Sequence, residues 1–201
     1  MDLKLSGRIA LITGGSRGIG FGGHLHLTSR NAADLDAARG KLLAAHKVNV
    51  TCHALDLGVS ENARKLGQAC RDVDILVNNA GAIPQGTLTG LAEKAWRESW
   101  DLKIFGYINL AREIYAAMCE RKRGVIMNII GGAGERPTAG YIAGSMANAG
   151  LMAFSRALGA ESPNFGVRVI GLNPSATATD RGISRWRNQA QKHLGDPERL
   201  R

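Results

Sequence analysis

A glycine-rich turn directly after a short apolar run constrains this chain more than any other feature of its sequence. The run occupies residues 8–12, and the turn at residues 13–20 contains Gly14, Gly15, Gly18 and Gly20. Glycine lets the backbone turn sharply and approach an anion, while free N–H groups at the start of the next helix point at that anion. A strand, a glycine turn and a nucleotide-binding unit in this order predict a phosphate-binding turn.

The connection after this turn is too short for the helix that such a unit requires. Only Phe21-Gly22-Gly23 separates the glycine turn from the next apolar run, which begins at His24. A parallel crossover takes about a dozen residues or more, usually with a helix of several turns. Either the helix has been deleted or a mobile segment is missing from the sequence. We favour the missing segment, because a deletion would uncover the central sheet and remove the helix dipole from the phosphate.

Apolar runs typical of strands recur along the chain, and helical patterns separate most of them. The clearest helix is expected within residues 91–121, and another begins near Tyr141 and ends at Gly159. The apolar row of the first helix consists of Trp100, Tyr107, Leu110 and Ile114. This alternation predicts an α/β fold with a parallel sheet. The strand-like runs are residues 9–13, 24–28, 48–54, 75–78, 124–130 and 167–172.

Length and composition favour a single domain over residues 1–201 in the cytoplasm. No apolar run approaches the ~20 residues of a membrane span, and the N-terminus lacks the basic start and apolar stretch of a signal peptide. The three cysteines, Cys52, Cys70 and Cys119, form no CxxC pair, which favours reduced thiols. We therefore expect neither a membrane partner nor disulfides.

The net charge of +9 leaves nucleic acid as a partner to consider. Lysines and arginines are spread along the chain, with a local excess only in residues 181–201. A solvated basic helix explains that excess more simply, so no nucleic acid is expected. A basic protein also suits a polyanionic ligand such as a phosphorylated dinucleotide.

Five motifs in order over residues 5–180 resemble those of the short-chain dehydrogenase/reductase family. They are the glycine turn at 13–20, Asp56-Leu57, Asn78-Asn79-Ala80-Gly81, Tyr141 and Asn173-Pro174. The resemblance implies a Rossmann-type doubly wound sheet with helices on both faces, binding of NAD(P) and interconversion of alcohols and carbonyls. It also implies that the final strand of the family's sheet is missing here, that residues 180–201 belong to a substrate-covering lobe, and that the protein is a homodimer or homotetramer.

The end of the second strand-like run favours NADP(H) over NAD(H). Sites that prefer NAD commonly place a carboxylate there, on the ribose hydroxyls. This chain instead reads Thr28-Ser29-Arg30, and Arg30 offers a planar fork of donors to a ribose phosphate, with Arg17 able to help. Two solvated arginines are the simpler alternative. The cofactor-binding residues expected from the motifs and the resemblance are Gly14, Ser16, Arg17, Gly18, Ile19, Gly20, Ser29, Arg30, Asp56, Leu57, Asn79, Ala80, Gly81, Pro174, Thr177 and Thr179.

The catalytic set departs from the family's pattern. The resemblance implies a tyrosine that exchanges a proton with the substrate oxygen, a lysine four residues later, a serine and an asparagine. Tyr141 is present, but the lysine position reads Ser145, the serine position Gly131 and the asparagine position Lys103. A cation near a tyrosine favours the phenolate.

Two interpretations of this set follow. Lys103 can replace the missing ammonium from a neighbouring helix, with Ser145, the N–H groups of Gly131 and Gly132, or Lys103 itself as donor to the carbonyl. Alternatively, the site has lost its chemistry, and the fold serves as a non-catalytic NADP-binding regulator or scaffold. We favour relocation of the lysine, because Lys103 lies in an apolar row where an unpartnered ammonium is costly.

The histidines do not predict a metal site. His24 and His26 share one face of a strand, but no third ligand has suitable sequence spacing. We expect histidines with satisfied hydrogen bonds in the sheet and no bound metal. The sequence indicates a small-molecule alcohol or carbonyl substrate without identifying it.

Overall fold

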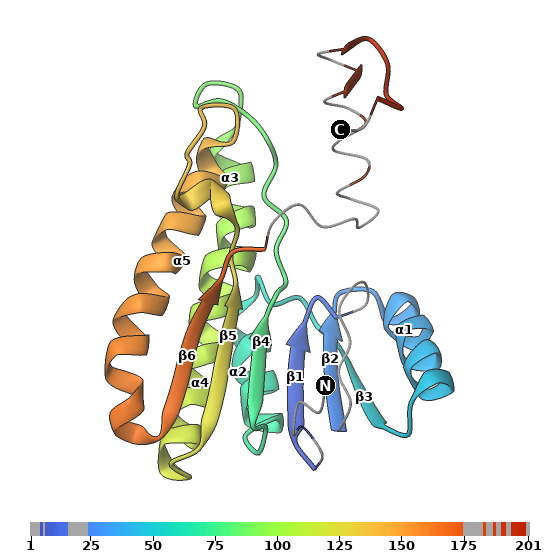
Figure 1. Cartoon of the computed structure of the whole chain (residues 1–201), viewed down its shortest axis with the longest axis vertical. Coiled ribbons are helices and arrows are strands. Elements are labelled where there is room, and N and C mark those ends of the chain that lie inside the picture. The colour runs from blue at the N-terminus through green and yellow to red at the C-terminus, as the bar shows by residue number, and fades with distance from the viewer. Residues whose placement is uncertain are drawn as a thin grey trace.

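The computed structural model describes residues 5, 7–15, 24–174, 183, 187, 190–191 and 194–199. Its centre is one six-stranded sheet in the order β3-β2-β1-β4-β5-β6, and every neighbouring pair is parallel (Figure 1). The α/β fold predicted from the sequence is therefore confirmed. The strands are β1 (Ile9–Thr13), β2 (His24–Ser29), β3 (Asn49–Ala54), β4 (Ile75–Asn78), β5 (Gly124–Ile129) and β6 (Val167–Leu172).

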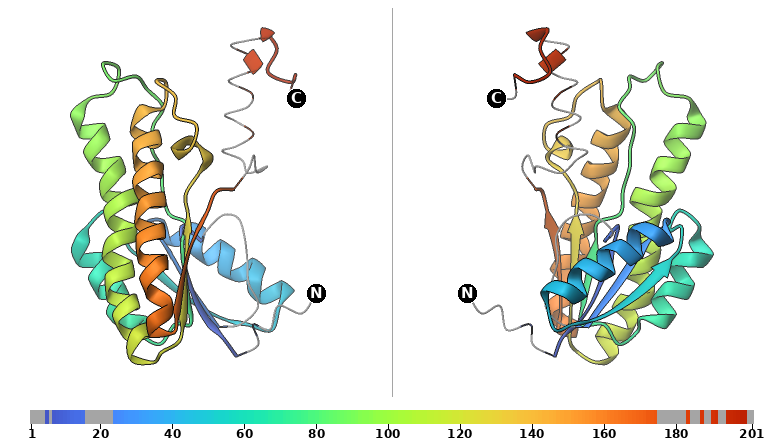
Figure 2. Two further views of the ribbon diagram at one scale, coloured as in Figure 1. Left: turned by 60° about the vertical axis from the view of Figure 1, so that its left-hand side comes forward. Right: turned by 90° about the vertical axis from the view of Figure 1, so that its right-hand side faces the viewer.

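Helices cover both faces of this sheet. Figure 2 shows α4 and α5 on one face and α1 on the opposite face, and the core places α2 beside α4. No helix within the described residues is long and apolar enough to cross a membrane. The helices are α1 (Ala32–Ala45), α2 (Ser60–Ala69), α3 (Glu93–Trp100), α4 (Gly106–Glu120) and α5 (Ile142–Glu161), with short helical turns η1 (Asp101–Phe105), η2 (Gly132–Gly134) and η3 (Ser162–Phe165).

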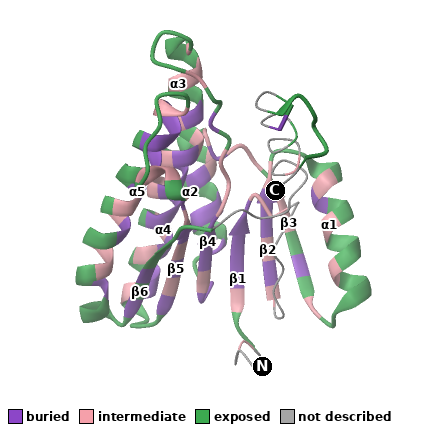
Figure 3. Cartoon of the chain, turned by 45° about the horizontal axis from the view of Figure 1, so that its top comes forward, coloured by how far each residue is buried: buried purple, intermediate pink, exposed green. Residues whose placement is uncertain are grey.

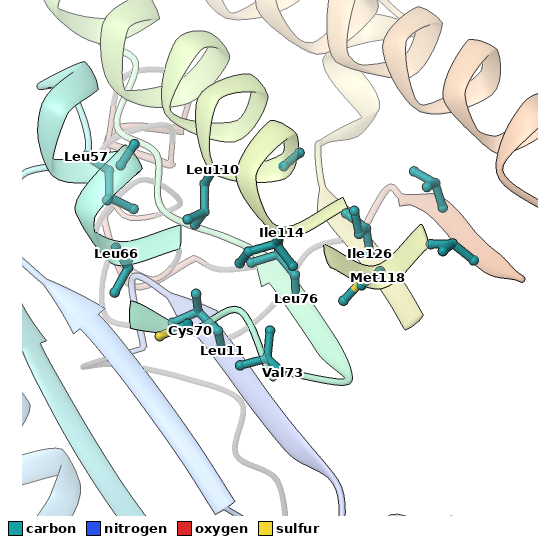
Figure 4. Packing of buried hydrophobic residues seen from close by; sticks show 14 residues of the cluster. Leu11, Leu57, Leu66, Cys70, Val73, Leu76, Leu110, Ile114, Met118 and Ile126 are labelled. Carbon is teal, nitrogen blue, oxygen red and sulfur yellow. The ribbon is translucent and has the colours of Figure 1, made fainter. Parts of the chain in front are cut away.

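The larger core lies between the sheet and the α2/α4 layer (Figure 4). Alternation along β1 directs Leu11 into this core and Ala10 and Ile12 to the α1 side. Leu11, Leu110 and Ile114 are fully buried, and each such side chain stabilises the fold by about 1.5–3 kcal/mol relative to exposure. Burial follows the sheet and the inner faces of its helices (Figure 3).

The α1 face is covered unevenly. Leu25, Leu27 and Leu35 are buried beneath α1, whereas Ile170 and Leu172 of β6 are 42% and 44% exposed. Register pairs Ile9 with His24 and Thr13 with Thr28, so β2 runs beside β1 over its whole length. Residues 16–23 lie outside the described residues, and with them the expectation of a deleted or missing helix.

The sequence analysis assumed one regular helix after β4. The structure instead interrupts this helix. Between α3 and α4, the N–H of Gly106 donates to the carbonyl of Asp101, five residues earlier, and residues 101–105 form a π-helical turn. The extra residue changes which side of the helix faces the sheet. Trp100 consequently packs with α5 residues, while Leu110 and Ile114 lie in the core beneath α4. Such turns occur often at functional sites, and this one contains Lys103.

Candidate functional site

The carboxyl ends of β1 and β4 are tied together at the point where the strand order reverses. The Thr13 hydroxyl accepts hydrogen bonds from the N–H of Asn79 at 2.8 Å and of Ala80 at 2.9 Å. The Asn79 side chain donates to the Thr13 carbonyl at 3.1 Å. Doubly wound sheets bind ligands at such a reversal point. Thr13, which the sequence analysis did not assign to the site, positions the Asn79–Gly81 segment.

Gly14 occupies a position that only glycine fits without strain. Its φ is +65°, its N–H donates to the Thr28 carbonyl at 2.8 Å, and a Cβ there would lie 3.0 Å from the Cα of Ala80. The backbone of β1 therefore approaches the segment after β4 closely. This is the close approach expected of a turn that carries a nucleotide.

A cavity of about 150 Å³ opens at this edge of the sheet. It lies over the ends of β1 and β2, and its wall includes the segments after β3 and β4. The residues that line it include Gly14, Ser29, Arg30, Leu57, Ala80 and Gly81, all assigned to the cofactor from the sequence. The residues present fit an adenine nucleotide, because the cavity combines apolar walls, a glycine turn and a cationic rim.

Arg30 and Asp56 face each other at the rim of the cavity. Their guanidinium nitrogen and carboxylate oxygen are 4.0 Å apart, and the side chains are 66% and 45% exposed. Asp56 also accepts a hydrogen bond from the N–H of Gly58 at 2.9 Å. An exposed pair of this kind contributes at most about 1 kcal/mol to stability. Arg30 is therefore available to turn from the carboxylate to an incoming phosphate.

Part of the predicted site lies outside the described residues: Ser16, Arg17, Gly18, Ile19, Gly20, Thr177 and Thr179. Pro174 is described and exposed. It follows Asn173, whose side chain accepts from the N–H of Gly131 at 3.3 Å and donates to Glu135 at 3.1 Å. This contact joins the segment after β6 to the turn after β5.

Lys103 carries a buried ammonium group at the end of β5. It is 8% exposed, and its Nζ donates to the Ile129 carbonyl at 2.7 Å and to the Tyr107 hydroxyl at 2.9 Å. Its aliphatic stem crosses Gly81, where a Cβ would lie 2.5 Å from Cδ of Lys103. The ammonium is thus held by oxygen acceptors beside the residue that lines the nucleotide cavity. A snorkelling surface lysine would not be enclosed in this way.

Tyr107 is the residue that sequence reasoning placed only in an apolar row. Its hydroxyl donates to the Ile129 carbonyl at 3.0 Å while accepting from Lys103, and the Lys103 ammonium lies 4.7 Å from the centre of its ring. Burial raises the pKa of the Tyr107 hydroxyl. Tyr107 therefore remains a neutral hydrogen-bonding partner that holds Lys103 in place. In the sequence, only the four-residue spacing between Lys103 and Tyr107 could have indicated this contact, because residues i and i+4 are neighbours on a helix.

The raised pKa of Tyr107 makes the fold sensitive to alkali. Above about pH 10 the unfolded chain ionises this tyrosine, whereas the folded chain keeps the proton. The folded state then binds more protons, so the free energy of unfolding falls by about 1.4 kcal/mol per pH unit. We expect Tyr107→Phe to remove this contribution in urea unfolding measured from about pH 9 to 11. If the free energy of unfolding changes with pH equally in the unaltered chain and in Tyr107→Phe, Tyr107 is not the source of the alkali sensitivity.

Tyr141 lies directly before α5, in a cluster shared with the helix that carries Lys103. It packs against the buried cluster of Ile83, Ala143 and Ala147. Trp100 and Ile104, from the same helical segment as Lys103, pack against this cluster too. A Cβ on Gly144 would lie 2.1 Å from Cζ of Tyr141, so the tyrosine ring lies over this glycine. The fold thus brings the elements of Tyr141 and Lys103 into contact through their neighbours.

Ser145, at the position of the family's lysine, is buried one turn into α5. Its hydroxyl accepts from the N–H of Thr138 at 3.3 Å. It therefore ties the loop before α5 to the first turn of this helix.

Comparison with known proteins shows the family to which the chain belongs. A family model described as short chain dehydrogenase matches residues 8–190. The chain is 31% identical over 194 residues to the 3-oxoacyl-[acyl-carrier-protein] reductase FabG of Salmonella typhimurium, across 89% of this chain and 77% of that protein. It is 26% identical over 200 residues to the 2,3-dihydro-2,3-dihydroxybenzoate dehydrogenase of Bacillus subtilis, across 92% and 76%.

Solved structures match the same architecture. The L-sorbose reductase of Gluconobacter frateurii, complexed with NADPH and L-sorbose, superposes with a TM-score of 0.88 at 29% identity, across 98% of this chain and 80% of that one. A metagenomic short-chain oxidoreductase in complex with NADP gives a TM-score of 0.78 at 30% identity, across 86% and 83%.

Proposed function

Because this chain belongs to the short-chain dehydrogenase/reductase family and is an NAD(P)-dependent oxidoreductase, we propose that it uses NADP(H) to interconvert an alcohol and a carbonyl. Tyr141 is the proposed acid/base, and Lys103 is the cation that tunes it. The observation that carries this proposal is the contact between Gly81 and Lys103. It joins the nucleotide cavity to the buried ammonium, and hence to the helix that packs with Tyr141.

The proposed cofactor site uses the described residues at the ends of the first four strands. The backbone at Gly14 approaches the pyrophosphate, Asp56 and Leu57 meet the adenine, and Asn79–Gly81 line the ribose. Arg30 binds the ribose phosphate of NADP(H), which agrees with the NADPH and NADP named for the two solved relatives. When bound, the nicotinamide supplies or accepts the hydride, and the protein orients it.

The chain's own contribution is control of one proton. The Tyr141 hydroxyl donates a proton to the substrate oxygen during reduction and removes it during oxidation. The Lys103 ammonium is proposed to assist this transfer by its positive charge. Ser145 supplies a hydroxyl that can donate to the carbonyl oxygen where the family's serine is absent. The substrate is an alcohol or carbonyl compound small enough to reach Tyr141.

Arg30 should determine the preference for NADPH. Replacing it in Arg30→Ala removes a charge-assisted hydrogen bond and is expected to weaken NADPH binding about tenfold or more. NADH affinity should not change, because NADH lacks the ribose phosphate. Titration of both nucleotides, followed by nicotinamide fluorescence, measures this difference. Arg39→Ala, which removes an exposed arginine from α1, is the matched control for net charge.

If Arg30→Ala lowers the affinities for NADPH and NADH equally, this arginine does not recognise the ribose phosphate. Turnover is tested by following NADPH oxidation with a broad panel of ketones and aldehydes. Oxidation that depends on the carbonyl compound supports the proposal. Tight NADPH binding without oxidation across the panel would favour the non-catalytic regulator.

A further inference from the structure

A cluster of histidines lies on the α2 face of the sheet. Register pairs Leu11 with His26, so His24 and His26 project from β2 on the same face as Leu11, toward the α2 layer. Their rings stack with centres 5.0 Å apart and an angle of 3° between planes. The Nε2 atom of His24 is buried and has no hydrogen-bond partner among the described residues. The cluster therefore includes one buried ring nitrogen that forms no hydrogen bond with the described residues.

Two further ligand-type side chains reach His26 from other elements. His53 comes from β3, and its Nε2 lies 2.9 Å from Nδ1 of His26. Cys70 follows α2, and its sulfur lies 3.9 Å from the same Nε2 of His53. One ligand atom of each residue lies within 4.8 Å of the other two. Sequence spacing could not reveal this set, because three separate elements supply it.

These separations are close to those of a tetrahedral zinc site. Zinc binds imidazole nitrogen at about 2.0–2.1 Å and thiolate sulfur at about 2.3 Å. Tetrahedral angles then place two nitrogens about 3.3 Å apart, and a nitrogen and a sulfur about 3.6 Å apart. The observed 2.9 Å and 3.9 Å differ from these values by a few tenths of an ångström, and the ligand atoms of His26 and Cys70 lie within 4.8 Å of each other. Binding of an ion would require rotation of these side chains.

The three proposed ligands differ in how far they are exposed. The thiol of Cys70 is fully buried, whereas the two imidazoles are partly exposed. The imidazoles are therefore the proposed ligands that solvent reaches, and the sulfur is the one enclosed by the core.

We propose that His26, His53 and Cys70 form a zinc site with three protein ligands and an open fourth position for water. Two imidazoles and one thiolate are the ligand types that Zn²⁺ prefers, and mixed sites of this kind are tetrahedral. The ion would tie β2 and β3 to the end of α2. This connection would strengthen the β2–β3 edge of the sheet. None of the three proposed ligands lines the nucleotide cavity, although the carbonyl of His53 accepts a hydrogen bond from Thr28, which does.

Metal titration of the purified full chain tests this site. After chelator treatment, Zn²⁺ is added in competition with a chromophoric indicator, and one ion per chain is expected to bind. His53→Gln and Cys70→Ser should each weaken binding about 100-fold or more, since even loss of an outer-shell partner costs about 10–100-fold. His46→Gln and Cys52→Ser remove the same residue types outside the cluster and should bind as the unaltered chain does.

Two measurements keep the test informative if a variant folds poorly. Co²⁺ added to the unaltered chain should give the thiolate charge-transfer band and the visible bands of a four-coordinate site. Zn²⁺ should raise the Tm of the unaltered chain and of both control variants, because ligands that bind only the folded state stabilise it. A cobalt spectrum without the thiolate band, or zinc binding that survives Cys70→Ser and His53→Gln, would overturn the proposal.

Discussion

Tyr141→Phe is expected to lower kcat by about 10²–10⁴-fold, the usual contribution of a positioned general acid or base. The substitution removes only the hydroxyl, so the ring can keep its packing over Gly144 and against the buried cluster that contains Ile83. NADPH affinity and Tm should therefore change little. Steady-state kinetics with any active carbonyl substrate, together with nucleotide titration, measure the two effects separately.

Tyr115→Phe is the matched control for this experiment. Tyr115 is a partly buried tyrosine of α4 that packs against the core beneath that helix, and Tyr141 lies in a different cluster. Its hydroxyl should contribute nothing to turnover. Full activity in Tyr141→Phe, or an equal loss in both variants, would rule out Tyr141 as the acid/base.

Lys103→Met should have the second-largest effect. The substitution keeps an aliphatic stem beside Gly81 and removes the buried ammonium that donates to the Ile129 carbonyl and the Tyr107 hydroxyl. Loss of one preorganised charged donor is expected to lower kcat about 10²–10³-fold. Steady-state kinetics with an active substrate, together with nucleotide titration, separate this loss from any change in NADPH affinity.

Tyr107→Phe separates the charge of Lys103 from its structural contacts. This variant removes one acceptor of the ammonium, while the Ile129 carbonyl remains at 2.7 Å. The charge stays in place, so kcat should fall much less than in Lys103→Met. If Tyr107→Phe and Lys103→Met lower kcat equally, then the packing and hydrogen bonds of Lys103, and not its charge, account for the effect.

The regular elements could be predicted from local pattern, with small differences at their ends. Apolar runs gave the bounds of β1, β4 and β6 as the structure has them, and the helix expected to stop at Gly159 continues to Glu161. The π-helical turn at residues 101–105 could not be predicted. A single hydrogen bond from Gly106 to Asp101 changes the helix phase there, and the apolar row carries no signal of it.

For the candidate site, motifs predicted which segments meet but not what their side chains do. The residues from Gly14 to Gly81 that line the cavity were found because parallel strands deliver their carboxyl ends to one edge. The role of Thr13 was missed, since its hydroxyl accepts from residues more than sixty positions away. The role of Tyr107 was missed because the sequence pattern shows that this tyrosine is buried but not which groups its hydroxyl contacts.

The sequence by itself determined the α/β class, the strand positions, the family and the segments of the nucleotide site, because these depend on periodicity and on local motifs. Only the tertiary structure decided how Lys103 is held and which side chains surround His26. Lys103 depends on acceptors from β5 and on the π-helical turn, and the His26 cluster combines β2, β3 and α2. Such contacts join residues far apart in the chain, and their energies depend on distance and burial, which sequence spacing does not encode.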